Sequence, residues 1–246
     1  MSQFLCILAS IVQGSAVGPA SYVVTGSDLR AVTDGNSMLK YADDTYLVVP
    51  ASNSRSCAEE IAHVEVWARR NNLRLNRVKS AEIVFVSPRS RQAVVIPAPG
   101  VPDIPRVEET KALGVTFSRK FSVARHVERL LVACAQSLFA LRTLRNHGLP
   151  IGALHTVFQA TVVSRLTYAS PAWWGLATAA DRDRLEAFLR RSAKLGFRPT
   201  TALTLADICS EADDRLFTRI TSNSLHLLHP LLPPRRDTHY SLRQRS

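Results

Sequence analysis

The sequence has few cysteines, and their spacing excludes the usual uses of cysteine pairs. Among 246 residues there are only Cys6, Cys57, Cys134 and Cys209, and none of them forms a CxxC motif. We therefore expect neither a zinc module nor a disulfide framework. A chain without structural disulfides is typical of a reducing compartment, so we expect an intracellular protein, nuclear or cytoplasmic.

Long apolar runs are also absent. No stretch approaches the roughly 18 to 20 apolar residues that a membrane-crossing helix needs, so we expect no spanning helix. The apolar segment Phe4–Val12 is not preceded by a basic residue, which argues against a signal peptide. Glycine and proline, at 10 and 13 residues, are too few for a disordered or fibrous chain. A hydrophobic content of 46% therefore indicates one large folded domain or two small ones.

Lysine is scarce in a chain that is otherwise strongly basic. Only 5 of the 31 basic residues are lysine, so the remaining 26 are arginine, and the net charge is +11. Residues 1–118 hold 12 basic and 11 acidic residues, a net of +1, whereas residues 119–246 hold 19 and 9, a net of +10. Arginine suits bidentate phosphate contacts. Nucleic acid is therefore the first candidate partner and an anionic membrane surface the second.

Hydrophobic periodicity predicts a mixed first part and a helical second part. Helical spacing appears over residues 56–71, 123–144 and 181–196, and Pro150 is expected to open a further helix. Pro19 is expected in the first turn of a helix running toward Arg30, and Ile83–Val86 as a short strand. Trp173 and Trp174 are expected in the core rather than stacked on bases. Strands mixed with helices, followed by helices alone, suggest two subdomains.

The most informative segment is Tyr41-Ala42-Asp43-Asp44. Strand-like runs lie on both sides, Met38–Tyr41 and Thr45–Val49, which predicts a tight hairpin with the aspartates at its tip. Carboxylate oxygens are the ligands that hard divalent cations prefer, and nucleotide addition uses two such ions. An Asp-Asp pair alone is weak evidence, because an ordinary polar turn has the same composition.

Three further motifs accompany the hairpin in a fixed order. Gln13-Gly14-Ser15-Ala16-Val17-Gly18-Pro19 precedes it, Leu73-Arg74-Leu75-Asn76-Arg77-Val78-Lys79-Ser80 follows it, and Leu113-Gly114-Val115-Thr116-Phe117 comes next. The set resembles the reverse transcriptases of non-LTR (LINE-type) retrotransposons, over residues 10–118 and more loosely to about residue 200. The looser part includes Tyr168-Ala169-Ser170-Pro171-Ala172-Trp173-Trp174-Gly175.

The resemblance implies an α+β fold and an activity. Residues 1–118 would form a partial polymerase palm, a small antiparallel sheet with packed helices. Residues 119–229 would form an all-α thumb-like region, and residues 230–246 a flexible basic tail. The implied activity is RNA-directed DNA polymerisation with Mg²⁺, or alternatively Mn²⁺. The implied partners are an RNA template, a DNA primer and deoxynucleoside triphosphates, with no membrane partner.

The resemblance also assigns roles to individual residues. Asp43 would be the catalytic metal ligand, with Asp44 supporting it. The nucleotide and primer end would be approached by the following residues: Gln13, Gly14, Ser15, Tyr41, Ala42 and Lys79. Asn76 is expected to shape its loop rather than to act chemically. Leu113, Gly114 and Val115 would form the primer grip. Phosphates of the duplex would be contacted by Arg182, Arg184, Arg190, Arg191, Lys194 and Arg198.

One catalytic carboxylate of the family has no counterpart in this sequence. In the family it comes from a strand well upstream of the Gln13 turn, but Met1–Val12 contains neither Asp nor Glu. We therefore expect the chain to be a fragment of a polymerase and to be inactive alone. The alternative is a retrotransposon-derived fragment that has no catalytic function and only binds nucleic acid. A palm without that strand is also expected to expose a sheet edge and to aggregate.

Overall fold

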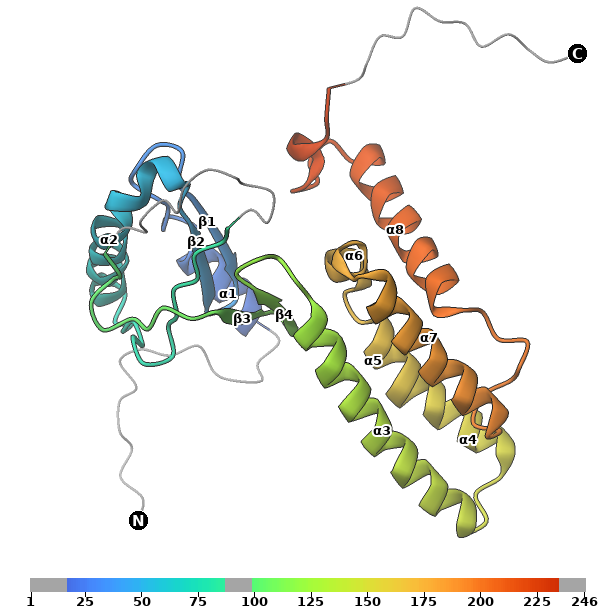
Figure 1. Ribbon diagram of the computed structural model, residues 1–246. Coiled ribbons are helices and arrows are strands. Elements are labelled where there is room, and N and C mark those ends of the chain that lie inside the picture. Colours follow the sequence, from blue (N-terminus) through green and yellow to red (C-terminus); the bar gives the residue numbers. More distant parts are fainter. Residues whose placement is uncertain (1–16, 87–98, 235–246) are drawn as a thin grey trace, which may run out of the picture. The chain divides into compact units, whose positions relative to one another are not determined.

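The computed structural model describes residues 17–86 and 99–234 (Figure 1). The chain divides into two compact units, with the boundary between residues 110 and 111. The first unit combines short helices with a hairpin, and the second is helical. The mixed composition confirms the expected α+β class. The assignment of these parts as palm and thumb, with a boundary at residue 118, stays a prediction.

The first unit is built around a two-stranded antiparallel hairpin. Its elements are α1 (Gly18–Thr25), β1 (Ser37–Tyr41), β2 (Asp44–Val48), the 3₁₀ helix η1 (Ala51–Ser56) and α2 (Cys57–Arg70). Strand β1 pairs with β2 from Ser37↔Val48 to Tyr41↔Asp44, which confirms the predicted hairpin. Helix α2 confirms the expected helix over residues 56–71. Helix α1 ends at Thr25, earlier than expected, because Gly26 follows as its C-cap.

The predicted strand at Ile83–Val86 is wrong. The backbone makes one isolated bridge, between Glu82 and Arg106, and residues 83–86 have no regular secondary structure. The N–H of Glu82 donates to the Pro105 carbonyl at 2.9 Å, and the N–H of Val107 donates to the Glu82 carbonyl at 2.8 Å. Residues 83–86 do not continue this bridge as a strand, although their side chains favour one.

The second unit begins with the end of a short hairpin and continues as a helical bundle (Figure 1). The hairpin strands are β3 (Glu109–Ala112), which spans the boundary between the units, and β4 (Val115–Ser118). The α-helices are α3 (Ala124–Asn146), α4 (Ile151–Phe158), α5 (Ser164–Thr167), α6 (Ser170–Trp173), α7 (Ala179–Lys194) and α8 (Leu205–Ser222). Shorter 3₁₀ turns are η3 (Trp174–Leu176) and η4 (His229–Leu231).

The long helices follow from local sequence signals. Helix α3 buries Val127, Leu130, Cys134, Leu138 and Leu141, which recur at intervals of three and four. Helices α7 and α8 each begin with a capping box, in which a threonine hydroxyl accepts from the N–H three residues later. These helices confirm the predicted ones over residues 123–144 and 181–196.

The helix opened by Pro150 contains a widened turn. Between α4 and α5 the backbone of Gln159–Val163, η2, is π-helical. Phe158 and Val163, five residues apart, are both buried, as are Val162 and Leu166. The wider turn therefore keeps the apolar side of α4 and α5 on one face.

The main hydrophobic core of the described chain lies in the second unit. It runs from Val115 to Cys209 and includes Trp173, which is fully buried, and Trp174. The expected core position of both tryptophans is therefore confirmed. In the first unit the buried apolar side chains are Leu29 and Ala68, so polar contacts carry more of its structure.

Candidate active site

The Tyr41–Asp44 segment forms the end of the β1–β2 hairpin. Tyr41 and Asp44 are the last paired residues, and Ala42 and Asp43 form the turn between them. Ala42 has φ 51°, a left-handed conformation that is unfavourable for a residue with a Cβ. Both aspartates are exposed to solvent. The predicted placement of acidic side chains at the hairpin tip is confirmed for Asp43, whereas Asp44 belongs to β2.

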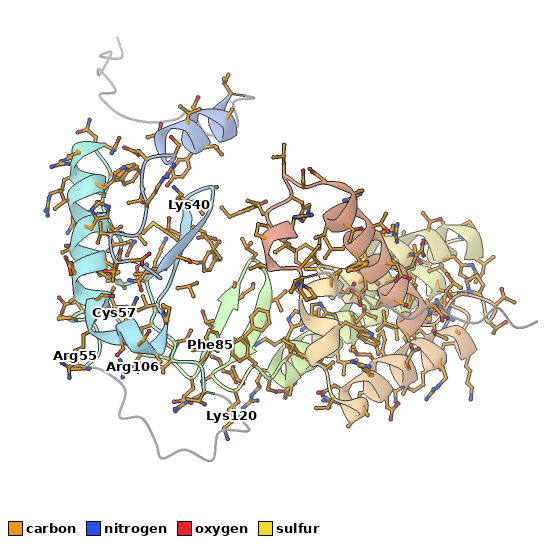
Figure 2. All side chains as sticks on the ribbon, turned by 90° about the horizontal axis from the view of Figure 1, so that it is seen from above. Lys40, Arg55, Cys57, Phe85, Arg106 and Lys120 are labelled. Atoms are coloured by element: carbon orange, nitrogen blue, oxygen red, sulfur yellow. The ribbon has the colours of Figure 1, made fainter. Side chains whose placement is uncertain are left out.

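Lys40 fixes the hairpin to the segment that follows α1. Its Nζ donates to the carbonyl oxygen of Leu29 at 2.7 Å and also to that of Gly26 (Figure 2). Gly26 is the C-cap of α1, whose carbonyl has no partner within the helix, and Leu29 lies in the segment that follows. A lysine is suited to this place because its charge interacts favourably with the helix C-terminus.

Helix α1 comes close to the catalytic candidate. Burial raises the pKa of Tyr22, and the negative charge of Asp43 raises it further. The charge of Asp43 therefore acts on a side chain of α1. The preceding Gln13, Gly14 and Ser15 lie outside the described residues, so their expected role stays a prediction.

A buried carboxylate not singled out from the sequence supports the other end of the hairpin. Glu60 of α2 is fully buried and accepts hydrogen bonds from the N–H groups of Val32 and Thr33 and from the side chain of Asn36. These residues lead directly into β1. The network fixes the entry to the hairpin, whereas Lys40 fixes it near the turn.

Lys79 lies in a turn organised by Asn76. The Asn76 side-chain oxygen accepts from the Lys79 N–H at 3.1 Å, and the Asn76 carbonyl accepts from the Ser80 hydroxyl at 2.9 Å. This confirms the expected loop-shaping role of Asn76. The Lys79 side chain is exposed. Its approach to a triphosphate stays a prediction.

Leu113 and Gly114 form the two-residue turn between β3 and β4. Both have positive φ, 44° and 92°, as tight hairpin turns require. Tyr168 contacts this turn: its hydroxyl donates to the Leu113 carbonyl at 3.1 Å. Val115 is buried against the helices. The hairpin form expected for this segment is confirmed, while its contact with a primer stays a prediction.

The basic residues in and after α7 differ in their availability. Arg190, Arg191 and Lys194 are exposed. Arg184 is exposed too, and lies 3.5 Å from the Asp181 carboxylate. These four side chains are open to solvent, and their contact with phosphates stays a prediction.

Arg182 and Arg198 are less available, because both bond to backbone carbonyls within the fold. Arg182 lies over the Trp174 ring, 5.0 Å from its centroid, and donates to the Trp174 carbonyl at 2.9 Å. Arg198 is buried, donates to the Leu203 carbonyl at 2.8 Å, and has its pKa lowered by burial. The guanidinium of Arg198 is thus bonded inside the fold, and its expected phosphate contact stays a prediction.

The described residues contain neither a preformed metal cluster nor a helix able to cross a membrane. Within residues 17–86 and 99–234, no group of three or more His, Cys, Asp or Glu side chains is arranged to hold a metal ion. Over the same residues, none of the helices has the length and apolarity needed to cross a membrane.

Comparison with curated proteins identifies relatives from transposable elements of Drosophila melanogaster. The chain is 26% identical over 201 residues to a probable RNA-directed DNA polymerase from transposon X-element, covering 77% of this chain and 22% of the relative. It is 29% identical over 139 residues to the RNA-directed DNA polymerase from mobile element jockey, covering 50% and 14%. A probable polymerase from transposon BS is 23% identical over 207 residues, covering 76% and 22%.

The chain thus spans less than a quarter of the length of each of these relatives. No known family profile matches the sequence. No solved structure is significantly similar to it.

Proposed function

Because this chain is related to the RNA-directed DNA polymerases of non-LTR transposable elements, we propose that it carries the later palm motifs and the thumb of such an enzyme. The observation that carries the proposal is the exposed Asp43–Asp44 pair at the end of a hairpin held by Lys40 and Glu60. The reaction is the transfer of a nucleotide to the 3′-hydroxyl of a DNA primer on an RNA template.

The carboxylates suit the metal chemistry of this reaction. Asp43 and Asp44 supply hard oxygen donors, which Mg²⁺ prefers, and both are open to solvent. They would hold the metal together with water, phosphate oxygens or a further carboxylate. When bound, the metal ions would activate the primer hydroxyl and stabilise charge on the transferring phosphoryl group. Lys79 would neutralise charge on the departing pyrophosphate.

Nucleic-acid binding would be provided by the second unit. The net charge of +10 over residues 119–246 favours attraction to a phosphate backbone. Exposed cations Arg190, Arg191 and Lys194 lie along one helix. The β3–β4 turn at Leu113 and Gly114 would contact the primer backbone.

Primer extension on the purified chain tests the catalytic part of this proposal. The substrate is an RNA template annealed to a DNA primer, with deoxynucleoside triphosphates and Mg²⁺ or Mn²⁺. If the chain extends the primer, contrary to the expectation that it is inactive alone, extension should be lost in Asp43→Asn and retained in Asp214→Asn, which alters an exposed carboxylate of α8. Extension that survives Asp43→Asn would overturn the catalytic role of Asp43.

The second candidate function is nucleic-acid binding without catalysis, and the uneven charge favours it independently of the hairpin. It predicts salt-sensitive binding of the primed template and no extension with either metal. A chain that neither extends nor binds the primed template would exclude both functions.

A further inference from the structure

The turn between β3 and β4 is contacted by a side chain 55 residues further along the chain. The Tyr168 ring lies so close to Gly114 that a Cβ built there would be 2.9 Å from ring atom Cε1. The hydroxyl of the same ring donates to the Leu113 carbonyl at 3.1 Å. The turn is therefore covered by the ring and held by its hydroxyl. Only glycine leaves room for this contact at position 114.

Burial does not explain the position of the Tyr168 ring. Its residue is 57% exposed, so the ring contributes little to the core. The contacts that define the ring's position are its hydrogen bond to Leu113 and its close approach to Gly114. A tyrosine hydroxyl that bonds to a backbone carbonyl fixes direction as well as distance.

The backbone of Tyr168 is itself anchored in the core. The indole Nε1 of Trp173 donates to the Tyr168 carbonyl at 3.0 Å, and Trp173 is fully buried. Ala169, between them, has φ 50°, which turns the chain sharply from α5 into α6. The tight connection thus aims Tyr168 away from the core and toward the turn.

The strand that follows the turn has a separate attachment. Arg129 of α3 donates from Nη1 to the Thr116 hydroxyl at 3.2 Å, and Thr116 and Val115 are both buried. Strand β4 is therefore held to α3 through Arg129, and the turn before it is held through Tyr168. Two separate attachments restrict the hairpin more than one would.

We propose that Tyr168 is a positioning residue for primer binding, holding the Leu113–Gly114 turn in one orientation on the helical unit. This inference rests on the proposed function, because it gives the turn a primer to contact. The turn and the exposed cations of α7 then act on the same duplex as parts of one body. Tyr168 itself touches neither substrate nor metal in this scheme.

Binding measurements on the full chain test the proposal. Three proteins are compared with the unaltered chain: Tyr168→Phe, which keeps the ring, Tyr168→Ala, and the control Phe139→Ala. Phe139 is 71% exposed on α3 and lies outside the proposed binding residues. Each is titrated with an RNA template carrying a recessed DNA primer and with the same RNA unpaired, and each is melted thermally.

The expected result is a selective loss of affinity for the primed template. Tyr168→Phe should weaken it about two- to tenfold, the worth of one hydrogen bond, and Tyr168→Ala more. Affinity for unpaired RNA and the melting temperature should change little, and Phe139→Ala should match the unaltered chain. Hydrogen exchange of the Gly114 and Val115 amides should increase in both Tyr168 variants.

The alternatives are separable. Equal losses for both ligands, or unchanged binding of the primed template, would overturn the positioning role while leaving the proposed function standing. An unaltered chain that binds neither ligand would overturn the proposed function, and this inference with it. If Tyr168→Ala does not fold, Tyr168→Phe decides between these outcomes.

Discussion

The buried carboxylate of Glu60 accepts a hydrogen bond of 2.8 Å from the side-chain amide of Asn36. Burial alone would raise the pKa of Glu60, but the bonds from Asn36 and from the N–H groups of Thr33 and Val32 outweigh it, and the pKa is lowered. The charged form is therefore the one that the fold stabilises. Helix α2 thereby determines how the chain enters the hairpin that carries Asp43.

Replacing Glu60 should destabilise the first unit. Glu60→Gln removes the charge and leaves backbone donors poorly satisfied, at a cost of about 1 to 3 kcal/mol. Urea unfolding of the variant measures this cost. Glu59→Gln, at the exposed neighbouring position, is the matched control and should lie within about 0.5 kcal/mol of the unaltered chain. Equal stability of Glu60→Gln would contradict the supporting role.

Acidification should reveal the same contact. Because the folded pKa of Glu60 lies below its unfolded value, its contribution to stability is present above about pH 4.5 and is lost as the pH falls through the folded pKa. The midpoint of urea unfolding, followed from pH 6 to pH 3, should fall more steeply for the unaltered chain than for Glu60→Gln. Parallel curves would count against this linkage.

His126 should make the stability of the second unit depend on pH under only mildly acidic conditions. Its ring is buried edge-on against Trp173, 5.2 Å between centroids. Burial, and then the charges of Arg129 and Lys111, lower its pKa. Protonation therefore favours the unfolded state, so stability is lost as the pH falls from about 6.5 through the folded pKa. His126→Phe should flatten the thermal stability profile between pH 7 and 5, whereas the same change at exposed His147 should not.

The basic residues in and after α7 should contribute unequally to nucleic-acid binding. Removing Arg190, Arg191 or Lys194 should weaken binding to any sequence and lower the slope of log Kd against log salt by roughly 0.7 to 0.9 per lost contact. Arg198→Ala should instead lower the melting temperature, because Arg198 is buried and bonded to Leu203. An unchanged slope in the triple alanine variant would remove this helix from the interface.

The β1–β2 hairpin should promote self-association. Leu39, Tyr41 and Val48 are 60%, 64% and 50% exposed and share one face of the two strands. In the described part of the chain these strands pair only with each other, so both edges are open. Leu39→Lys should shift the chain toward monomer in sedimentation at micromolar concentration. Val78→Lys, at an isolated position 91% exposed, is the control and should have no effect.

Much of the fold could be predicted from patterns of residues that are close together in the sequence. The stripe along α3 and the Tyr41–Asp44 hairpin depend on residues close in sequence, so their periodicity and turn chemistry sufficed. The strand expected at Ile83–Val86 did not form; the β-bridge to Arg106 is made by Glu82, the residue just before it. The widened turn at Gln159–Val163 has no distinctive composition and could not have been foreseen.

The sequence predicted the residues that carry the chemistry of the candidate site, but not the residues that hold them in place. Asp43 was identified by its motif, whereas Tyr168 acts on Leu113 across 55 residues, a distance that no local pattern spans. Glu60 did leave a signal: with Val64 and Ala68 it follows the four-residue spacing of the apolar side of α2. The burial of Arg198 could not be predicted, because arginine favours the surface and no local pattern indicates its bond to Leu203.

The π-helical turn at Gln159–Val163 sets the phase between α4 and everything that follows it. A regular α-helix rotates by roughly 100° per residue. If the chain wound regularly here at its present length, Leu166 would rotate out of the core and Tyr168 would move away from Gly114. Loss of one residue from this turn should therefore be tolerated as regular α-helix, whereas a further inserted residue should not be, and Val162 and Val163, which are buried, should tolerate little change.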